Sequence, residues 1–204
     1  MNKIFSTLLV FVIASIGFIG CSKTTPEKTI VTEPNIMSVE EWGGNKPLAT
    51  KEPQKIEYIT IHHSGVVFPE GKDPVQGMRN LQKFSQVDKE WIDIPYHFSM
   101  DLDGNTYAAR PIEYAGDTNT EYDPTGHALI EVMGNYEEQT IKPAQLDSLA
   151  HLTAWLAQKY DVPVSNIASH KDFSDQTVCP GADLYKYFED GSFIEKVKAY
   201  LGEK

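Results

Sequence analysis

Residues 56–64 read IEYITIHHS, a mostly apolar and β-branched stretch that ends in two adjacent histidines. Its length and composition are typical of a buried β-strand. Because successive side chains of a strand point to opposite faces of the sheet, His62 shares a face with Thr60. His63 points the other way, together with Ile61. His62 is therefore the better candidate for a ligand, and His63 for a packed residue or a support of its neighbour.

Other stretches of strand length predict the rest of a sheet, and they lie at residues 96–100, 106–109, 128–133 and 167–168. Asp103-Gly104 separates the first two of these stretches and is a hairpin signal. We therefore expect those two strands to be antiparallel neighbours.

Three stretches with helical periodicity predict helices that cover the sheet. The first begins at Asp73-Pro74, a cap followed by a first-turn proline, and its apolar side is formed by Val75, Met78, Leu81 and Phe84. The clearest spans residues 143–160, with a stripe formed by Leu146, Leu149, Thr153, Leu156 and Tyr160. The last begins with the capping-box pair Ser192 and Glu195 and presents Phe193, Val197 and Leu201. Together the elements predict an α/β fold, a mixed central β-sheet flanked by helices in a single domain.

The N-terminus has the composition of an export signal. Lys3 precedes an apolar run, residues 8–19, which is too short to span a bilayer as a mature helix. The run ends in FIGCS, residues 18–22, which resembles a bacterial lipobox, in which the cysteine after the cleavage site receives a diacylglycerol. We expect residues 1–20 to be a signal peptide and lipidated Cys21 to be the mature N-terminus. The alternative is an ordinary secretory signal with an incidental cysteine.

The segment after the signal is polar. Residues 21–34 are rich in Thr, Lys, Glu and Pro, so they are expected to form a flexible tether before a folded domain of residues 35–204. This organisation places the domain in the bacterial cell envelope, attached to a membrane by lipid on its periplasmic or extracellular side.

Charge and size limit the possible partners. The chain has 204 residues, enough for one domain with a sizeable core, and its 41% hydrophobic content excludes a disordered protein. It has 18 Lys and Arg against 29 Asp and Glu, a net charge of −11. Binding to nucleic acid depends on clustered cations, which this sequence lacks. We expect a monomer without a nucleic-acid partner.

Cys179 is a candidate metal ligand. If Cys21 is lipidated, Cys179 is the remaining cysteine and no intramolecular disulfide can form. A lone cysteine is usually a small core residue, but Cys179 follows His170 by nine positions. Imidazole and thiolate are ligands of zinc, and three protein ligands with a fourth position left to water are typical of a catalytic site. His127 and His151 look structural or exposed. His151 lies off the apolar stripe of its helix and is therefore expected in solvent.

Several segments spread over most of the chain carry a resemblance to a known family: EWG at 41–43, ITIHHS at 59–64, WIDIPYHF at 91–98 with its following hairpin, SHKD at 169–172 and TVCPG at 177–181. With these motifs the chain resembles the type-2 N-acetylmuramoyl-L-alanine amidases, a family that also includes phage amidase lysozymes and animal peptidoglycan recognition proteins. It departs from the usual pattern in YAG at 114–116, in DPTGH at 123–127 and in a loop at 172–176 that is one residue longer.

The resemblance implies the site residues. It gives His62, His170 and Cys179 as ligands of Zn²⁺ and places Tyr96 and Thr177 at the reaction centre, although some members have a lysine in place of Thr177. Several members carry a glutamate in the central strand, and Glu131 falls at the matching position. The alternative for Glu131 is a solvent-facing strand residue, with its two neighbours in the core.

The resemblance also implies the reaction, which is zinc-dependent hydrolysis of the amide between N-acetylmuramic acid and L-alanine in peptidoglycan or muropeptides, during turnover or remodelling of the cell wall. No organic cofactor is implied. Three alternatives stay open: a module that binds peptidoglycan without cutting it, a zinc peptidase that acts on another cell-wall amide, and a structural lipoprotein.

Overall fold

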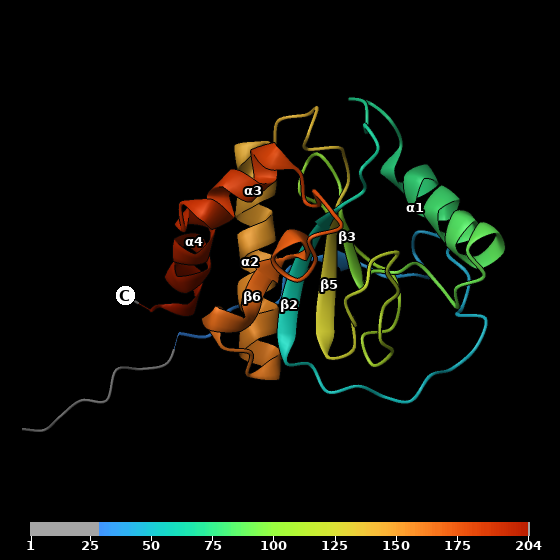
Figure 1. The fold of residues 1–204 in the computed structure, drawn as a ribbon, viewed down its shortest axis with the longest axis horizontal. Coiled ribbons are helices and arrows are strands. Elements are labelled where there is room, and N and C mark those ends of the chain that lie inside the picture. The colour runs from blue at the N-terminus through green and yellow to red at the C-terminus, as the bar shows by residue number, and fades with distance from the viewer. Residues whose placement is uncertain (1–28, 204) are drawn as a thin grey trace, which may run out of the picture.

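The computed structural model describes residues 29–203, which form a six-stranded sheet with helices on both sides (Figure 1). The predicted signal peptide and Cys21 lie outside the described residues. Within residues 29–203, no helix is both long enough and apolar enough to cross a membrane.

The sheet has the strand order β1-β4-β3-β5-β2-β6. Its strands are β1 (Ile36–Met37), β2 (Tyr58–His63), β3 (Phe98–Met100), β4 (Thr106–Ala108), β5 (His127–Val132) and β6 (Ile167–Ser169). The hairpin pair β3 and β4 is antiparallel, and the other neighbours are parallel. The predicted mixed sheet and its antiparallel hairpin are thus confirmed. The sequence pattern missed β1, which has only two residues.

The helices cover the two faces of the sheet unequally. Their bounds are α1 (Pro74–Lys83), continued by a π-helical turn η1 (Phe84–Asp88), α2 (Pro143–Tyr160), α3 (Ala182–Glu189) and α4 (Ser192–Leu201), with 3-10 turns η2 (Val164–Asn166) and η3 (His170–Asp172). Helices α2, α3 and α4 lie together on one side of the strands, and α1 lies on the other side (Figure 1). The side of the sheet that carries α1 also carries a cavity, which residues of α1 line.

The main core lies between the sheet and α2. On β2, Ile59 and Ile61 are fully buried there, and on β5 Ile130 and Val132 join them. Four of the five residues of the predicted α2 stripe are buried and Tyr160 packs against the same core, so the stripe is confirmed. Helix α2 is buried beyond its stripe because it also packs against α4.

A smaller apolar cluster lies on the side of α1. Trp42 is fully buried there, and its indole N–H donates to the carbonyl of Ala108 at 2.7 Å. Met78 of α1 is buried in the same cluster. The predicted apolar side of α1 is wrong at Phe84, which is 46% exposed. The buried residues at this end are Gln82 and Ser85, which follow Met78 at helical spacing, and Phe84 lies between them at the wall of a cavity.

The last helix begins at the predicted residue with a different cap. Gly191, in the left-handed conformation, is the N-cap of α4, where Ser192 was expected. The carboxylate of Asp190 accepts hydrogen bonds from both the amide and the hydroxyl of Ser192. Ser192 is thus the first helical residue, and the preceding acid takes over the capping of its amide.

Part of the predicted tether packs against the domain. Val31 is buried, and its amide donates to Oε1 of Gln158 on α2 at 2.9 Å. His151, expected in solvent, hydrogen-bonds the carbonyl of Thr32 and stacks on Tyr200 of α4 with ring centroids 4.9 Å apart. The packed domain therefore begins before Val31, and residue 35 is not its boundary.

A buried histidine beside the hairpin predicts acid sensitivity. Nδ1 of His97 accepts from the amide of Leu129 and Nε2 lies 2.9 Å from the carbonyl of Tyr114, so the neutral ring satisfies both contacts. Burial lowers the pKa of His97 to about 4. Its contribution to stability is complete above the unfolded pKa of about 6.5 and is lost as the pH falls toward 4, about 3 kcal/mol in all.

We expect His97→Asn to flatten the pH profile of stability in this window, because asparagine cannot take up the proton. The free energy of unfolding, measured with denaturant between pH 7 and 4, should fall less steeply for the variant than for the wild type. Parallel profiles would show that His97 does not control the acid response.

Candidate metal centre

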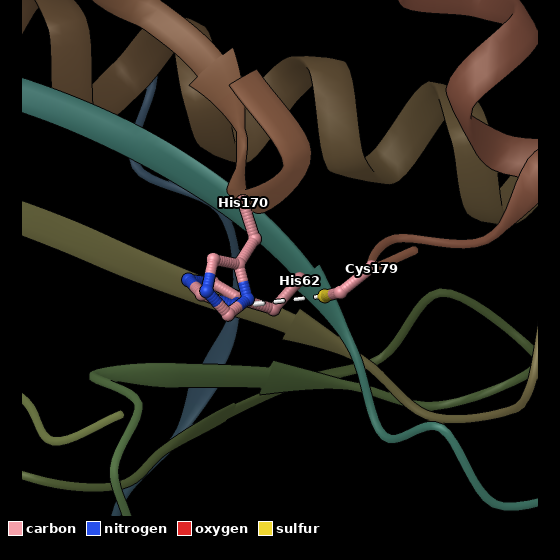
Figure 2. A group of neighbouring side chains, drawn as sticks. All are labelled: His62, His170 and Cys179. Atoms are coloured by element: carbon pink, nitrogen blue, oxygen red, sulfur yellow. Dashed lines mark hydrogen bonds between the residues drawn. The ribbon is translucent and has the colours of Figure 1, made fainter. Parts of the chain in front are cut away.

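Three side chains from separate segments meet on the sheet face that carries α1. The donor atoms of His62, His170 and Cys179 all lie within 4.8 Å of one another, and all three residues are buried. Figure 2 shows the two imidazoles and the thiol pointing toward one another from β2, from the start of η3 and from the loop before α3. The structure thus brings together the three residues that were expected to be ligands.

Strand alternation places the histidine pair as predicted. His62 lies opposite Glu131 in the register of β2 with β5, away from the main core. His63 lies on the other face, where its Nδ1 accepts from the amide of Tyr136 at 3.2 Å. The backbone amide of His63 also donates to Sγ of Cys179 at 3.3 Å, so His63 supports the thiol through its main chain.

A tight turn fixes His170. Ser169 and Asp172 form a capping box around η3, with the carboxylate of Asp172 accepting from the amide and the hydroxyl of Ser169. The amide of Lys171 donates to the carbonyl of Cys179 at 2.8 Å and joins the two ligand-bearing segments. A backbone hydrogen bond therefore holds the segment of His170 against the segment of Cys179.

The loop around Cys179 approaches the chain closely. Thr177 Oγ1 accepts from the amide of Cys179 at 3.0 Å, and the peptide bond between Cys179 and Pro180 is cis. Gly181 has φ of +88°, and a Cβ there would lie 2.5 Å from the carbonyl carbon of Tyr136. Glycine is therefore required at the point where this loop passes the main chain after β5.

The protonation states suit a cation. Burial, followed by the neighbouring His170, lowers the pKa of His62 well below its usual value, and burial lowers that of His170 to about 4. Both rings are thus neutral at pH 7 and offer a lone pair. Burial raises the pKa of the Cys179 thiol to about 12, and coordination to a metal removes such a proton outright.

The geometry of these residues fits zinc. Nδ1 of His62 lies 3.7 Å from Sγ of Cys179, too far for a strong hydrogen bond. Bond lengths of about 2.3 Å to sulfur and about 2.0 Å to nitrogen at tetrahedral angles separate two such donors by about 3.5 Å. Nε2 of His62 is buried without a hydrogen-bond partner within residues 29–203. One metal ion cannot bind both nitrogens of a ring, so the fit to zinc rests on the Nδ1–Sγ separation and on the donor set, while Nε2 needs a separate partner.

The three remaining predicted site residues line the same cavity, which has a volume of about 650 Å³. The Tyr96 ring lies beside His62, with centroids 5.1 Å apart. Burial raises the pKa of Tyr96 well above its usual value, so its hydroxyl keeps its proton at pH 7. Thr177 lines the cavity while its hydroxyl supports the amide of Cys179.

Glu131 faces the site and not the solvent. It is 2% exposed, and its carboxylate accepts hydrogen bonds from the hydroxyls of Ser64 and Ser99. Burial raises the pKa of Glu131, and the two serine bonds oppose the shift. The solvent-facing alternative is therefore wrong, because β5 is an interior strand and α1 with its adjoining loops covers this face.

The cavity extends beyond the metal ligands. Its walls come from α1, from the loop after β2, from residues 117–120 and from residues 176–177. Phe84 of η1 and Val66 of the loop are exposed at this wall. An open groove with apolar walls that reaches a buried donor cluster can bind an extended ligand.

Several contributors were not apparent from the sequence. Thr120 Oγ1 lies 2.8 Å from Nε2 of His170, and the Tyr122 ring lies 5.0 Å from the ring of His170 between centroids. Both residues come from a turn-rich stretch without periodicity, which gives no local signal. His127 was expected to be either structural or exposed, and the structure shows it in a structural role. Its Nδ1 lies 2.7 Å from Thr60 Oγ1.

Known proteins resemble this chain in sequence and in fold. The sequence profile of the N-acetylmuramoyl-L-alanine amidase family matches residues 52–182. Peptidoglycan-recognition protein LB of Drosophila melanogaster is 28% identical over 159 residues, covering 76% of this chain and 68% of that protein.

Solved structures agree with this match. A mutant of the Drosophila protein LB in complex with tracheal cytotoxin superimposes with a TM-score of 0.67 at 25% identity, over 76% of this chain and 92% of that one. The N-acetylmuramoyl-L-alanine amidase endolysin LysCS of Clostridium intestinale superimposes with a TM-score of 0.62 at 26% identity, over 85% of this chain and 99% of that one. The profile match covers more than half of the sequence and includes all three clustered donors, so this chain belongs to the N-acetylmuramoyl-L-alanine amidase family.

Proposed function

We propose that this protein is a zinc hydrolase that cuts the amide between N-acetylmuramic acid and L-alanine in peptidoglycan. The observation that carries the proposal is the buried set of two imidazoles and one thiol at the floor of an open cavity. Three ligands leave a position for water or substrate, as catalytic zinc sites do. The family of the chain supplies the class of substrate, and a relative bound to tracheal cytotoxin supports a muropeptide as ligand.

His62, His170 and Cys179 would hold the metal. When bound there, zinc would polarise the scissile carbonyl and lower the pKa of a water molecule. The low pKa values of the two histidines keep both rings available as neutral ligands, and the surrounding loops hold the three donors together before any metal arrives.

Tyr96 is proposed to stabilise the negative charge that develops on the carbonyl oxygen. Its ring lies beside His62 at the cavity wall, and its raised pKa keeps the hydroxyl proton in place for donation. A donor that is already positioned for this charge does not have to reorganise during the reaction.

Glu131 is proposed to move the proton. Because its pKa is raised, the buried carboxylate binds a proton more readily than an ordinary glutamate. It can therefore accept a proton from the attacking water and return it to the amide nitrogen. The carbon–nitrogen bond then breaks, the nitrogen leaves as the free amine of L-alanine, and the lactyl group keeps the carboxylate. Ser64 and Ser99 hold the carboxylate in place from both sides.

Binding without cleavage is the main competing function, because several similar proteins carry the name of recognition proteins. Loss of a zinc ligand would be the expected mark of a pure binding module. All three donors are present and buried together in this chain, which favours catalysis.

The products of digestion distinguish the candidate functions. Sacculi treated with the wild-type protein should release stem peptides with a free N-terminal L-alanine, detected by mass spectrometry, and Cys179→Ala should release none. A peptidase would leave at least one amino acid on the muramic acid. Peptides that lack the first alanine would overturn the proposed bond, and tight binding to sacculi without any release would identify a binding module.

A further inference from the structure

The loop at residues 117–120 reaches the metal centre through a single hydroxyl. Thr120 Oγ1 lies 2.8 Å from Nε2 of His170. Thr118 Oγ1 lies 2.8 Å from Thr120 Oγ1 and also accepts the amide of Thr120 at 3.1 Å. These bonds form one path from Thr118 through Thr120 to His170.

The two nitrogens of His170 are therefore not equivalent. Nε2 is occupied by the hydroxyl, whereas Nδ1 has no hydrogen bond to any residue of the described chain, 29–203. A metal needs a ring nitrogen with a free lone pair, and the hydrogen bond at one nitrogen decides which nitrogen that is. If Nε2–H donates to Thr120 and the Thr120 hydroxyl donates to Thr118, each hydrogen bond on the path has one donor and one acceptor, and Nδ1 keeps its lone pair.

We propose that Thr120 is a positioning residue of the metal centre, which fixes the tautomer and the ring orientation of His170 so that Nδ1 serves as the ligand. The inference rests on the proposed zinc site and adds a residue that touches neither the metal nor the reacting atoms. Partners of this kind typically change metal affinity by about 10- to 100-fold.

The loop is anchored firmly enough for this role. The buried guanidinium of Arg110 pairs with Asp117, at the start of the loop, and also donates to the carbonyl of Ile94 at 2.8 Å. Lys51 reaches the same carboxylate at 3.2 Å. Two cations thus hold the loop against the domain, and the Thr120 hydroxyl is presented to His170 from a fixed backbone.

Zinc affinity of the purified protein, measured without substrate by competition with a chromophoric chelator, tests the inference. Thr120→Val keeps the shape of the side chain and removes the hydroxyl, so it should weaken zinc binding by about 10- to 100-fold. Thr120→Ser keeps the hydroxyl and should stay within a few-fold of the wild type. Asn119→Ala is the matched control in the same loop, since Asn119 is exposed and its side chain bonds Lys89 and not His170.

A second measurement does not depend on the metal. The ¹⁵N chemical shifts of the His170 ring in metal-free protein should report a proton on Nε2 in the wild type and a mixture of tautomers in Thr120→Val. Three outcomes would overturn the role of Thr120 and leave the proposed function standing. They are equal zinc affinity of Thr120→Val and wild type, equal weakening in Asn119→Ala, and a proton on Nδ1 of His170 in the wild type. A wild type that binds no zinc would overturn the proposed function and this inference together.

Discussion

Cys179→Ala should lose both zinc and amidase activity. The substitution removes the sulfur donor of the cluster and leaves two imidazoles, too few for a stable three-ligand site. Zinc binding should weaken by more than the roughly 10- to 100-fold that follows the loss of an outer partner. Turnover of sacculi should fall below detection, because the metal would be absent at working concentrations.

Elemental analysis and circular dichroism check this expectation together. Zinc should be near one per chain in the wild type and near zero in Cys179→Ala, while the far-ultraviolet spectrum stays native. Val178→Ala is the matched control, since Val178 is the preceding residue in the same loop and is 59% exposed. Activity in a preparation free of zinc would refute the assignment of these residues as ligands.

Tyr96→Phe should keep zinc and fold and lose most of its turnover. Only the hydroxyl is removed, and its proposed interaction exists in the transition state, so kcat should fall while KM changes little. Loss of one donor of this kind costs about 3 to 4 kcal/mol, or a factor of roughly 10² to 10³ in kcat.

Steady-state kinetics on soluble muropeptides, with zinc content measured in parallel, separates this role from packing. Tyr200→Phe makes the same chemical change on α4, where the hydroxyl donates to Asp147 on the opposite side of the sheet from the cleft, and should leave kcat unchanged. An undiminished kcat in Tyr96→Phe would leave Tyr96 as a packing residue.

Local patterns were sufficient for much of this molecule. The opposite faces of His62 and His63 follow from the pleat of a single strand, and α2 follows from one apolar stripe. The cluster of His62, His170 and Cys179 was expected from motif resemblance, and the structure shows the three donors together. Lipidation of Cys21 stays a prediction, because that residue lies outside the described chain.

Tertiary structure decided the surroundings of the donors. Glu131 was equally compatible with solvent or a site until parallel pairing placed it beside Ser99, 32 positions away. Thr120 and His170 are 50 positions apart, and no local periodicity links them. A strand or helix pattern specifies which way a side chain points within its own element. The partner that it meets depends on how the elements pack, and in this protein that packing determines the burial of Glu131 and the hydroxyl beside His170.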